Sequence, residues 1–314
     1  MLKLSSNVFF DALTFQNRDR PPVWLMRQAG RYMPQYQKLR KKYSLEEMFH
    51  NKGLIADVTL LPVNHIGVDA AILFSDILLI LEAIGCSVTY EGGISVKIGD
   101  SPFDPAPLKP ALEAIRLLKR ELKVPLIGFA GGPYTVATYL KCPITPELLQ
   151  KITDATRLYL EMQIDAGVDV IQIFDSWAGT LPPEVFEEMS LKYLKQLVPL
   201  EVPTLLFTRG SCRYAEALNG LGATGISLDS EKSPEEIRWR LPNTVLQGNL
   251  DPEILKMPKA IIKSYVGVMM KRMRRDRGYI VNLGHGVLPD TPYENVKYFV
   301  HLVQDIFAKD YLLT

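Results

Sequence analysis

The sequence predicts a single (β/α)8 barrel, a ring of eight parallel strands in which each strand is followed by a helix. Three observations support this prediction. Short apolar runs alternate with longer helical patterns, and the alternation occurs eight times within 314 residues. No G-x-G-x-x-G pattern opens a helix after any run, which disfavours the alternative of a doubly wound open sheet. No shift in composition marks a second domain, so residues 1–314 are expected to form one domain.

The strands are expected where apolar runs are short and bounded by turn residues. These runs are residues 23–26, 69–74, 125–129, 168–174, 204–207, 225–228, 244–247 and 279–283. Helices are expected in the intervening stretches, namely residues 34–43, 45–65, 77–84, 111–123, 146–167, 183–200, 214–221, 234–240, 253–275 and 291–309. Ser44 and Glu47 form a capping-box pattern, and Gly167 is expected to end the helix that follows Thr145. Residues 91–110, rich in Gly and Pro, are expected to be a connection.

Composition excludes several classes of protein. The chain is 47% apolar and carries a formal net charge of +1, so no global basic field favours nucleic acid or a membrane surface as a partner. The three cysteines are widely spaced, which disfavours a disulfide scaffold and a Cys-based zinc site and fits a reducing compartment. No signal or transit peptide is evident, and Asp76 and Glu82 interrupt the most apolar run. A cytoplasmic location is therefore expected.

The stretch Val-Trp-Leu-Met-Arg-Gln-Ala-Gly-Arg-Tyr-Met-Pro, at residues 23–34, predicts a binding site for an anion. It places Arg27 and Arg31 four residues apart with no acid between them, and Arg40 follows in the next helix. Arg is the side chain best suited to bidentate capture of carboxylate or phosphate. The alternative is a surface turn whose arginines pair with acids elsewhere in the fold.

Polar residues collect at the carboxyl ends of the expected strands, where a (β/α)8 barrel carries its active site. They are Arg27, Gln28, Arg31, Asp76, Asp175, Ser176, Arg209, Asp229, Asn249 and His285. His285 lies between two glycines in a polar loop, where packing offers little reason for an imidazole, and this favours a function. No H-x-x-x-H, G-x-S-x-G or P-loop pattern occurs, so metal hydrolysis and serine-type acyl transfer lack support.

Several of these residues also have ordinary structural explanations. Asp76 could cap the following helix, serve a function, or do both. Asp251 before Pro252 is most simply a helix N-cap. Asp229 could be a cap or pair with Arg209. Tyr139 lies in a helical pattern, where a core position is the more common role.

Six blocks of this sequence resemble the uroporphyrinogen decarboxylase family. The longest is Leu-Met-Arg-Gln-Ala-Gly-Arg-Tyr-Met-Pro at residues 25–34. The others, in the order of the family, are Phe-Ser-Asp-Ile at 74–77, Gly-Phe-Ala-Gly-Gly-Pro-Tyr-Thr at 128–135, Gln-Ile-Phe-Asp-Ser-Trp-Ala-Gly at 172–179, Gln-Gly-Asn-Leu-Asp-Pro at 247–252 and Asn-Leu-Gly-His-Gly at 282–286. The resemblance implies a homodimeric barrel without a cofactor or metal. It further implies removal of carbon dioxide from the four acetate side chains of uroporphyrinogen III, which gives coproporphyrinogen III in heme and chlorophyll biosynthesis.

The resemblance also implies roles for individual residues. Asp76 would face the pyrrole N–H groups and, with Arg27, Tyr139 and His285, form the catalytic set. The expected substrate-binding residues are Arg27, Gln28, Ala29, Gly30, Arg31, Arg40, Phe74, Asp76, Phe129, Tyr139, Phe174, Ser176 and His285. An ionised Asp76 would stabilise the cation formed when the ring is protonated. The general acid stays open between Arg27, Tyr139, His285 and a bound water.

Two rival functions and one departure accompany the resemblance. A methyltransferase of the same fold would need an H-x-C pair, which the sequence lacks. A non-catalytic tetrapyrrole-binding protein is disfavoured because Asp76 stands beside all three arginines. The loops after Glu91 and Tyr139 are shorter than is usual in the family, which could alter substrate closure or dimer contacts.

Overall fold

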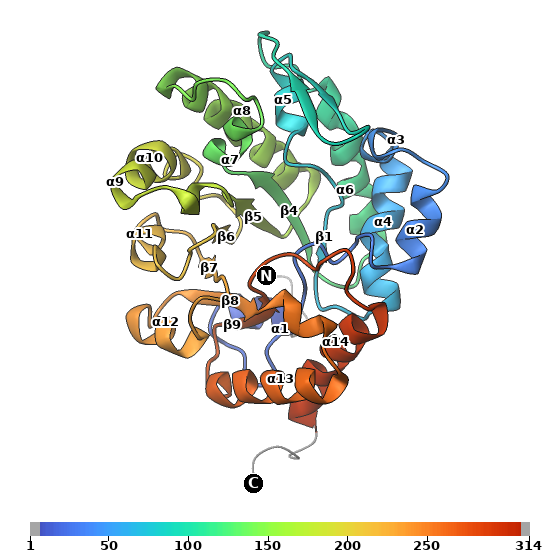
Figure 1. The fold of residues 1–314 in the computed structure, drawn as a ribbon, viewed down its shortest axis with the longest axis vertical. Helices are drawn as coiled ribbons and strands as arrows, with labels where there is room; N and C mark the ends of the chain where they lie inside the picture. The colour runs from blue at the N-terminus through green and yellow to red at the C-terminus, as the bar shows by residue number, and fades with distance from the viewer. Residues whose placement is uncertain (1–6, 309–314) are drawn as a thin grey trace.

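A curled, parallel seven-stranded sheet lies at the centre of the molecule, with helices around it (Figure 1). The computed structural model describes residues 7–308. In order across the sheet, the strands are β1 (Ala71–Ile72), β4 (Leu126–Gly131), β5 (Val170–Phe174), β6 (Thr204–Phe207), β7 (Gly225–Ser227), β8 (Val245–Leu250) and β9 (Tyr279–Leu283). Each lies within or beside an expected run. The expectation of parallel strands joined by helices is therefore confirmed for these seven.

The first expected strand, residues 23–26, contributes a single parallel bridge, between Val23 and Val281 of β9. The Trp24 amide donates to the Val281 carbonyl at 3.3 Å, and the Val281 amide donates to the Pro22 carbonyl at 2.8 Å. On the other side, the Asp69 amide donates to the Val23 carbonyl at 2.8 Å, just before β1 begins. The segment that leads to Arg27 thus lies between the two edge strands of the sheet.

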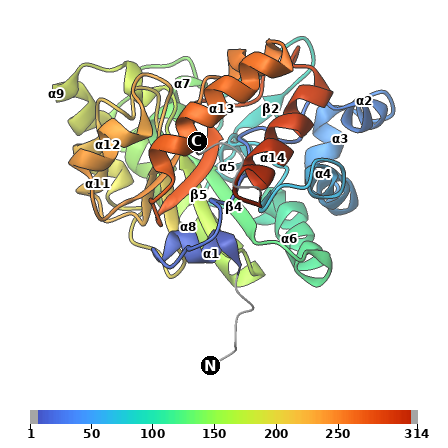
Figure 2. The ribbon, with the colours of Figure 1, turned by 90° about the horizontal axis from the view of Figure 1, so that it is seen from below.

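Most helices form where they were expected, but several are shorter or divided. Figures 1 and 2 show them around the sheet. Their bounds are α1 (Val8–Leu13), α2 (Pro34–Arg40), α3 (Leu45–Phe49), α4 (Lys52–His65), α5 (Leu79–Ala83), α6 (Lys109–Glu121), α7 (Pro133–Thr138), α8 (Pro146–Ala166), α9 (Pro183–Phe186), α10 (Lys192–Leu194), α11 (Ala215–Asn219), α12 (Pro234–Arg240), α13 (Lys259–Met273) and α14 (Tyr293–Ala308). The capping box of Ser44 and Glu47 and the left-handed Gly167 at the end of α8 are confirmed.

Three of the expected helices are divided. The expected helix 45–65 breaks because the Asn51 side chain caps a new helix, accepting from the amides of Gly53 and Leu54. The expected helix 253–275 breaks at Pro258, which separates a 3-10 helix (Pro252–Lys256) from α13. A π-helical segment (Glu187–Leu191) lies between α9 and α10. The expected end of the last helix, Lys309, lies outside the described residues.

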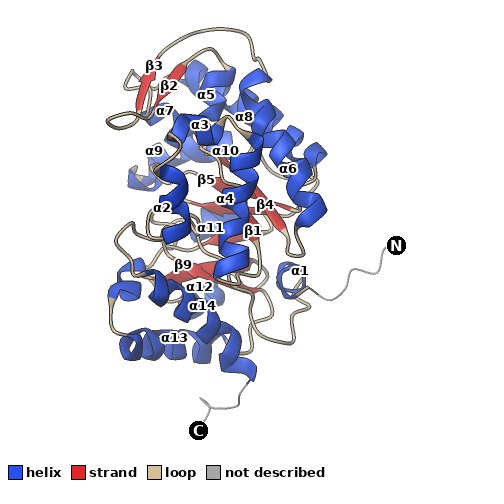
Figure 3. Cartoon of the chain, turned by 90° about the vertical axis from the view of Figure 1, so that its right-hand side faces the viewer, coloured by secondary structure: helices blue, strands red, loops and turns tan. Residues whose placement is uncertain are grey.

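The expectation for residues 91–110 is wrong in part, because a β-hairpin lies at their start. Strands β2 (Ser87–Thr89) and β3 (Ser95–Lys97) pair antiparallel, outside the central sheet. Figure 3 shows this hairpin at the end of the molecule beside α5. Gly92 and Gly93 have φ of 68° and 123°, a conformation that only glycine adopts readily. The hairpin carries Ile94 to the edge of the central sheet's carboxyl end.

A buried polar chain crosses the interior of the sheet among apolar side chains. The Trp24 indole donates to Gln247 Oε1 at 2.8 Å, and Gln247 Nε2 donates to Gln172 Oε1 at 3.0 Å. Ser227 donates to the same Gln172 oxygen at 3.1 Å. Because each of these groups is buried, the bonds replace those that water would otherwise supply.

Within the described part of the chain, no helix is long and apolar enough to cross a membrane.

Candidate active site

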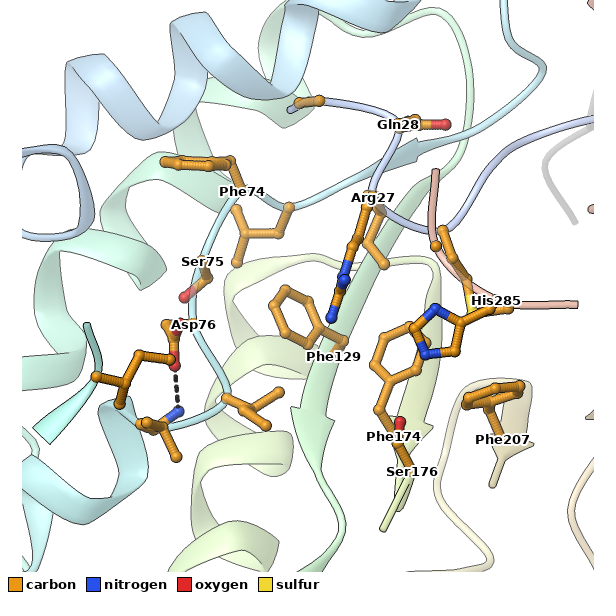
Figure 4. A pocket seen from close by; sticks show the side chains of 18 of the residues that line it. Arg27, Gln28, Phe74, Ser75, Asp76, Phe129, Phe174, Ser176, Phe207 and His285 are labelled. Atoms are coloured by element: carbon orange, nitrogen blue, oxygen red, sulfur yellow. Dashed lines mark hydrogen bonds between the residues drawn. The ribbon is translucent and has the colours of Figure 1, made fainter. Parts of the chain in front are cut away.

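A cavity of about 330 Å³ opens at the carboxyl ends of the strands (Figure 4). This size lies within the range of small-molecule sites. Ten expected residues line it: Arg27, Gln28, Ala29, Phe74, Asp76, Phe129, Tyr139, Phe174, Ser176 and His285. In Figure 4, Asp76 and His285 lie at opposite sides of the cavity, with Arg27 and Phe129 between them. Segments far apart in the sequence therefore meet at one site.

Three expected substrate-binding residues, Gly30, Arg31 and Arg40, do not line the cavity. Arg31 and Arg40 lie close enough to Tyr36 for their charges to oppose the burial that raises its pKa. Tyr36 in turn packs edge-on against Phe74, with ring centroids 5.9 Å apart. These two arginines therefore stand behind the wall of the cavity, at its outer side.

The alternative that the arginines pair with acids elsewhere does not hold for the described side chains. None of Arg27, Arg31 and Arg40 forms an ion pair within residues 7–305. Arg40 instead donates to the Tyr43 carbonyl at the end of its own helix. Three cationic side chains thus remain uncompensated on one side of the cavity, as expected where an anionic ligand is to bind.

Arg27 is held in an unusual backbone conformation. Its φ is 59°, in the left-handed region that costs a non-glycine residue about 1–3 kcal/mol. The turn is fixed from below by the buried Gln28 side chain, which donates to the Ala70 carbonyl at 3.1 Å and accepts from the Leu25 amide at 3.2 Å. From above, Gly286 makes room for it, because a Cβ there would lie 2.4 Å from Arg27 Cδ. The guanidinium is thereby aimed into the cavity (Figure 4).

Asp76 comes just after β1 and brings the negative charge of the site. One carboxylate oxygen accepts from the Leu78 amide at 2.7 Å, so the residue also caps the turn before α5. Burial raises its pKa to about 6, with Glu82 adding to the rise and the Leu78 amide and Arg27 opposing it. The carboxylate is therefore mostly ionised at pH 7, and the structural and functional roles are compatible.

His285 follows β9 and faces the aromatic wall. Its ring lies edge-on to Phe207, with centroids 6.3 Å apart. Burial, together with the charges of Arg27 and Arg209, lowers its pKa to about 4. In the free protein at pH 7 the imidazole is therefore neutral and serves as a hydrogen-bonding group.

The remaining walls are mostly aromatic and come from adjacent strands. Phe129 and Phe174 meet edge-on at 5.8 Å, and Phe174 meets Phe207 at 6.1 Å. Sequence reasoning missed Phe207 and Ile94. Phe207 ends its strand just as Phe174 does, and this common position is the signal that could have identified it.

Other polar residues at the strand ends have structural roles. Asp175 is fully buried and accepts from the Thr135 amide at 2.8 Å and the Ser190 hydroxyl at 2.5 Å. Asp229 accepts from the Glu231 amide in a loop turn, whereas Ser233 caps α12 and no ion pair joins Asp229 to Arg209 among the described side chains, so neither expected role of Asp229 forms. Asn249 donates to the Lys232 carbonyl at 2.7 Å. Asp251 accepts from Glu253 and confirms the expected N-cap.

The described side chains also limit what else could bind. They contain no group of three or more His, Cys, Asp or Glu residues placed to hold a metal ion. The cavity offers instead one carboxylate, a set of nearby guanidinium groups and flat aromatic walls. This combination suits a large, flat organic ligand that carries donors at its centre and carboxylates at its edge.

Comparisons with known proteins agree with this chemistry. The sequence profile of the uroporphyrinogen decarboxylase (URO-D) family matches residues 4–142 and 144–306. The uroporphyrinogen decarboxylase of Protochlamydia amoebophila is 42% identical, over 94% of this chain and 90% of that protein. One from Thermus thermophilus is 37% identical, over 98% of this chain and 100% of that protein. A solved methyltransferase from Methanosarcina mazei shares the fold, with a TM-score of 0.79 and 23% identity over 94% of this chain and 97% of that one. The chain therefore belongs to the uroporphyrinogen decarboxylase family of carboxy-lyases.

Proposed function

We propose that this enzyme removes carbon dioxide from the four acetate side chains of uroporphyrinogen III, and so makes coproporphyrinogen III for heme and chlorophyll biosynthesis. The proposal rests on one observation: a carboxylate, Asp76, and a guanidinium, Arg27, both line the same aromatic-walled cavity. A tetrapyrrole presents ring N–H donors at its centre and carboxylates at its edge. The carboxylate and the guanidinium groups match these two features respectively.

Asp76 supplies the charge that lowers the barrier. Protonation of the ring carbon beside an acetate creates a cationic iminium system, into which the electron pair of the breaking carbon–carboxylate bond can move. The exocyclic carbon then takes up a proton and becomes a methyl group, and the ring carbon releases the proton it had gained. An ionised carboxylate bonded to the ring N–H groups stabilises the cation throughout, without needing to reorganise.

The proton donor is to be sought among Arg27, Tyr139, His285 and a bound water. Arg27 lies closest to where an acetate would bind, but an ordinary guanidinium has a pKa above about 12 and releases its proton poorly. His285 is neutral in the free protein. A substrate carboxylate bound beside Arg27 would offset part of the positive charge that keeps the imidazole unprotonated, so substrate binding would bring His285 closer to a donor's pKa.

Substrate size explains how Arg31 and Arg40 could still take part. A macrocycle with eight carboxylate arms is larger than the drug-sized ligands that cavities of roughly 300–1,000 Å³ enclose. Its edge would reach beyond the lining, where Arg31 and Arg40 are exposed or half-buried.

The wider assembly belongs to the same proposal. Residues 1–314 form one domain, in which the Val23 segment is the eighth strand and closes the barrel; its hydrogen bonds to both edge strands support this. The enzyme acts without a cofactor, as a homodimer in the cytoplasm. Near-complete coverage of both chains in the comparisons supports carrying these family features over.

The direct test is decarboxylation itself. Purified protein is incubated with chemically reduced uroporphyrinogen III under anaerobic conditions and without added cofactor, and the products are separated by their number of carboxylates. We expect eight-carboxylate substrate to be replaced by four-carboxylate product through intermediates with seven, six and five. Persistence of the substrate at stoichiometric enzyme over hours would overturn the proposal and favour a non-catalytic binding protein.

A further inference from the structure

A cation beside the cavity has no assigned role. Arg209 lies two residues beyond Phe207, at the carboxyl end of β6, and its amide donates to the Ser176 carbonyl at 3.4 Å. Ser176 and Phe207 both line the cavity. The charge of Arg209 also reaches His285, because it is one of the causes of the low pKa of that imidazole. Arg209 therefore stands beside the cavity on the side opposite Asp76.

The guanidinium of Arg209 is oriented but not neutralised. It lies over the Trp177 ring, 4.4 Å from the centroid, an arrangement that leaves the guanidinium edge free for a ligand. Its Nε is buried without a hydrogen-bond partner, and it forms no ion pair within residues 7–305. Asp229, at the end of the next strand, accepts from the Glu231 amide through Oδ1, and its Oδ2 is buried without a partner rather than paired with Arg209. A buried donor without a partner is costly unless something else binds it.

A hollow beside the cavity gives a ligand's edge access to this region. Trp177 lines this second, shallower hollow together with Lys141, which like Arg209 forms no ion pair among the described side chains. Ile94 and Tyr139 line both the hollow and the cavity, so the two lie side by side. A ligand too large for the cavity would extend past these shared side chains toward Trp177 and Arg209.

We propose that Arg209, stacked on Trp177, is a second carboxylate-binding residue, which holds an arm of the tetrapyrrole at the edge that extends toward Trp177. Arg27 and Arg209 then each hold one arm, while Asp76 addresses the centre of the ring. This assignment rests on the proposed function and adds a specificity residue to it. The planar fork of Arg209 favours a carboxylate, with which it can form two parallel hydrogen bonds.

The test is steady-state kinetics on uroporphyrinogen III. The main variant and its control, Arg209→Gln and Arg213→Gln, each remove one positive charge. Arg209→Gln should raise KM about tenfold and change kcat by less than about threefold, because the lost contact serves binding. Arg209→Lys, which keeps the charge but loses the planar fork, should raise KM by an intermediate amount, about threefold. Trp177→Leu, which keeps the charge but removes its platform, should raise KM by about threefold. Arg213→Gln is the control, since Arg213 is exposed on the same loop and pairs with Glu231 at 3.7 Å; its KM should equal that of wild type.

A second measurement separates binding from support of the fold. Loss of the Arg209 charge should raise the pKa of the His285 imidazole, measured by NMR titration of the free protein, whereas Arg213→Gln should leave it unchanged. Equal KM values for Arg209→Gln and Arg213→Gln would overturn the inference. So would a lower melting temperature for Arg209→Gln without a change in KM. Inactivity of the wild type would refute the proposed function itself.

Discussion

At the scale of single residues, burial shifts the pKa values of the titratable groups in the site toward their uncharged forms. Asp76 is the clearest case, since burial raises its pKa to about 6 while the proposed reaction needs it ionised. Because the pKa of Asp76 is higher in the folded than in the unfolded protein, its ionisation at neutral pH lowers the free energy of unfolding. A carboxylate that serves only as a helix cap usually has a lowered pKa and raises the free energy of unfolding instead.

Asp76→Asn tests this conflict. The amide oxygen can still accept from the Leu78 amide, so the turn before α5 is retained. We expect turnover to fall by at least about a thousandfold, since the charge facing the ring is lost. The melting temperature should be equal to or above that of wild type. Asp251→Ala is the control: it should keep its activity and lose about 1 kcal/mol of stability, as expected for a helix cap. Similar effects on activity in both variants would contradict the assignment.

The same pKa sets a pH dependence. Because Asp76 must be ionised, kcat/KM should fall tenfold per pH unit below about pH 6 and level off above it. The pKa of His285 is about 4 in the free enzyme, so the pH–rate profile should show no inflection from His285 near 6.5, the ordinary pKa of an imidazole. The profile is measured on wild type and on His285→Gln. If the acid limb near pH 6 disappears in His285→Gln, the imidazole rather than Asp76 is the titrating group.

Which residues the sequence could predict follows from their chemistry. Arg27 and His285 stood out because an uncompensated cation or an imidazole at a strand end has few structural reasons to be there. Asp76 also had an ordinary explanation as a helix cap, and its role came from the family resemblance. The sequence could not show that the Gln28 side chain forms hydrogen bonds with two backbone groups and is not available to a ligand. Nor could it show that Arg27 has a positive φ. Both depend on contacts with segments far away in the chain. Phe207 was missed because an apolar strand end looks the same whether it faces a cavity or a core.

At the scale of elements, the ends of β4 and β5 are joined by one buried carboxylate. Asp175 bonds to the Thr135 amide at the start of α7 and to Ser190 of the π-helical segment. Gly132 lies against it so closely that a Cβ there would be 2.3 Å from Asp175 Cβ. The arrangement fixes the loops that carry Tyr139 and Ser176 to the cavity, although Asp175 itself does not line it.

Replacing Asp175 should therefore affect stability first. Asp175→Ala leaves the buried Thr135 amide and Ser190 hydroxyl without partners, which should cost roughly 3 kcal/mol. Asp175→Asn retains an acceptor for Thr135 and a group that Ser190 can bond, so it should cost about 1 kcal/mol. Urea unfolding measures both. A smaller loss for Asp175→Ala than for Asp175→Asn would show that burying a polar side chain at this position costs more than its hydrogen bonds contribute.

Element boundaries show where sequence patterns lose information. The strands and the longer helices were predictable because their apolar periods are long enough to recognise. The hairpin of β2 and β3 was not, since each strand has only three residues and two are polar and exposed. The π-helical segment was hidden for a different reason: residues 183–200 carry a continuous helical pattern, and only the bond from Ser190 to Asp175 marks the position where the helix widens.

At the scale of the whole molecule, an aspartate ties neighbouring strands together at two strand starts, on the face opposite the cavity. Gly-Val-Asp appears at residues 67–69 and again at 167–169. In each case the Asp carboxylate accepts from the amide of the neighbouring strand, Val23 for Asp69 and Leu126 for Asp169, both at 2.8 Å. Each Asp also pairs with a cation, Arg20 or Lys119. This repeat is visible in the sequence, but its meaning depends on which strands become neighbours.

The two copies differ in what they hold, and this difference allows a matched test. Asp169 joins β4 to β5 within the continuous sheet, whereas Asp69 ties β1 to the segment that ends in Arg27. Asp69→Ala and Asp169→Ala should each lower the free energy of unfolding by roughly 1–3 kcal/mol, since each leaves an amide unpaired and removes a partly exposed ion pair. Only Asp69→Ala should also raise KM for uroporphyrinogen III, by about threefold or more at a temperature where both variants are folded. It loosens the segment that positions Arg27, and small displacements of a binding group weaken the contacts it makes. If both variants change KM equally, closure at Val23 does not position the site, and the strained turn at Arg27 is held from the cavity side alone, by Gln28 and Gly286.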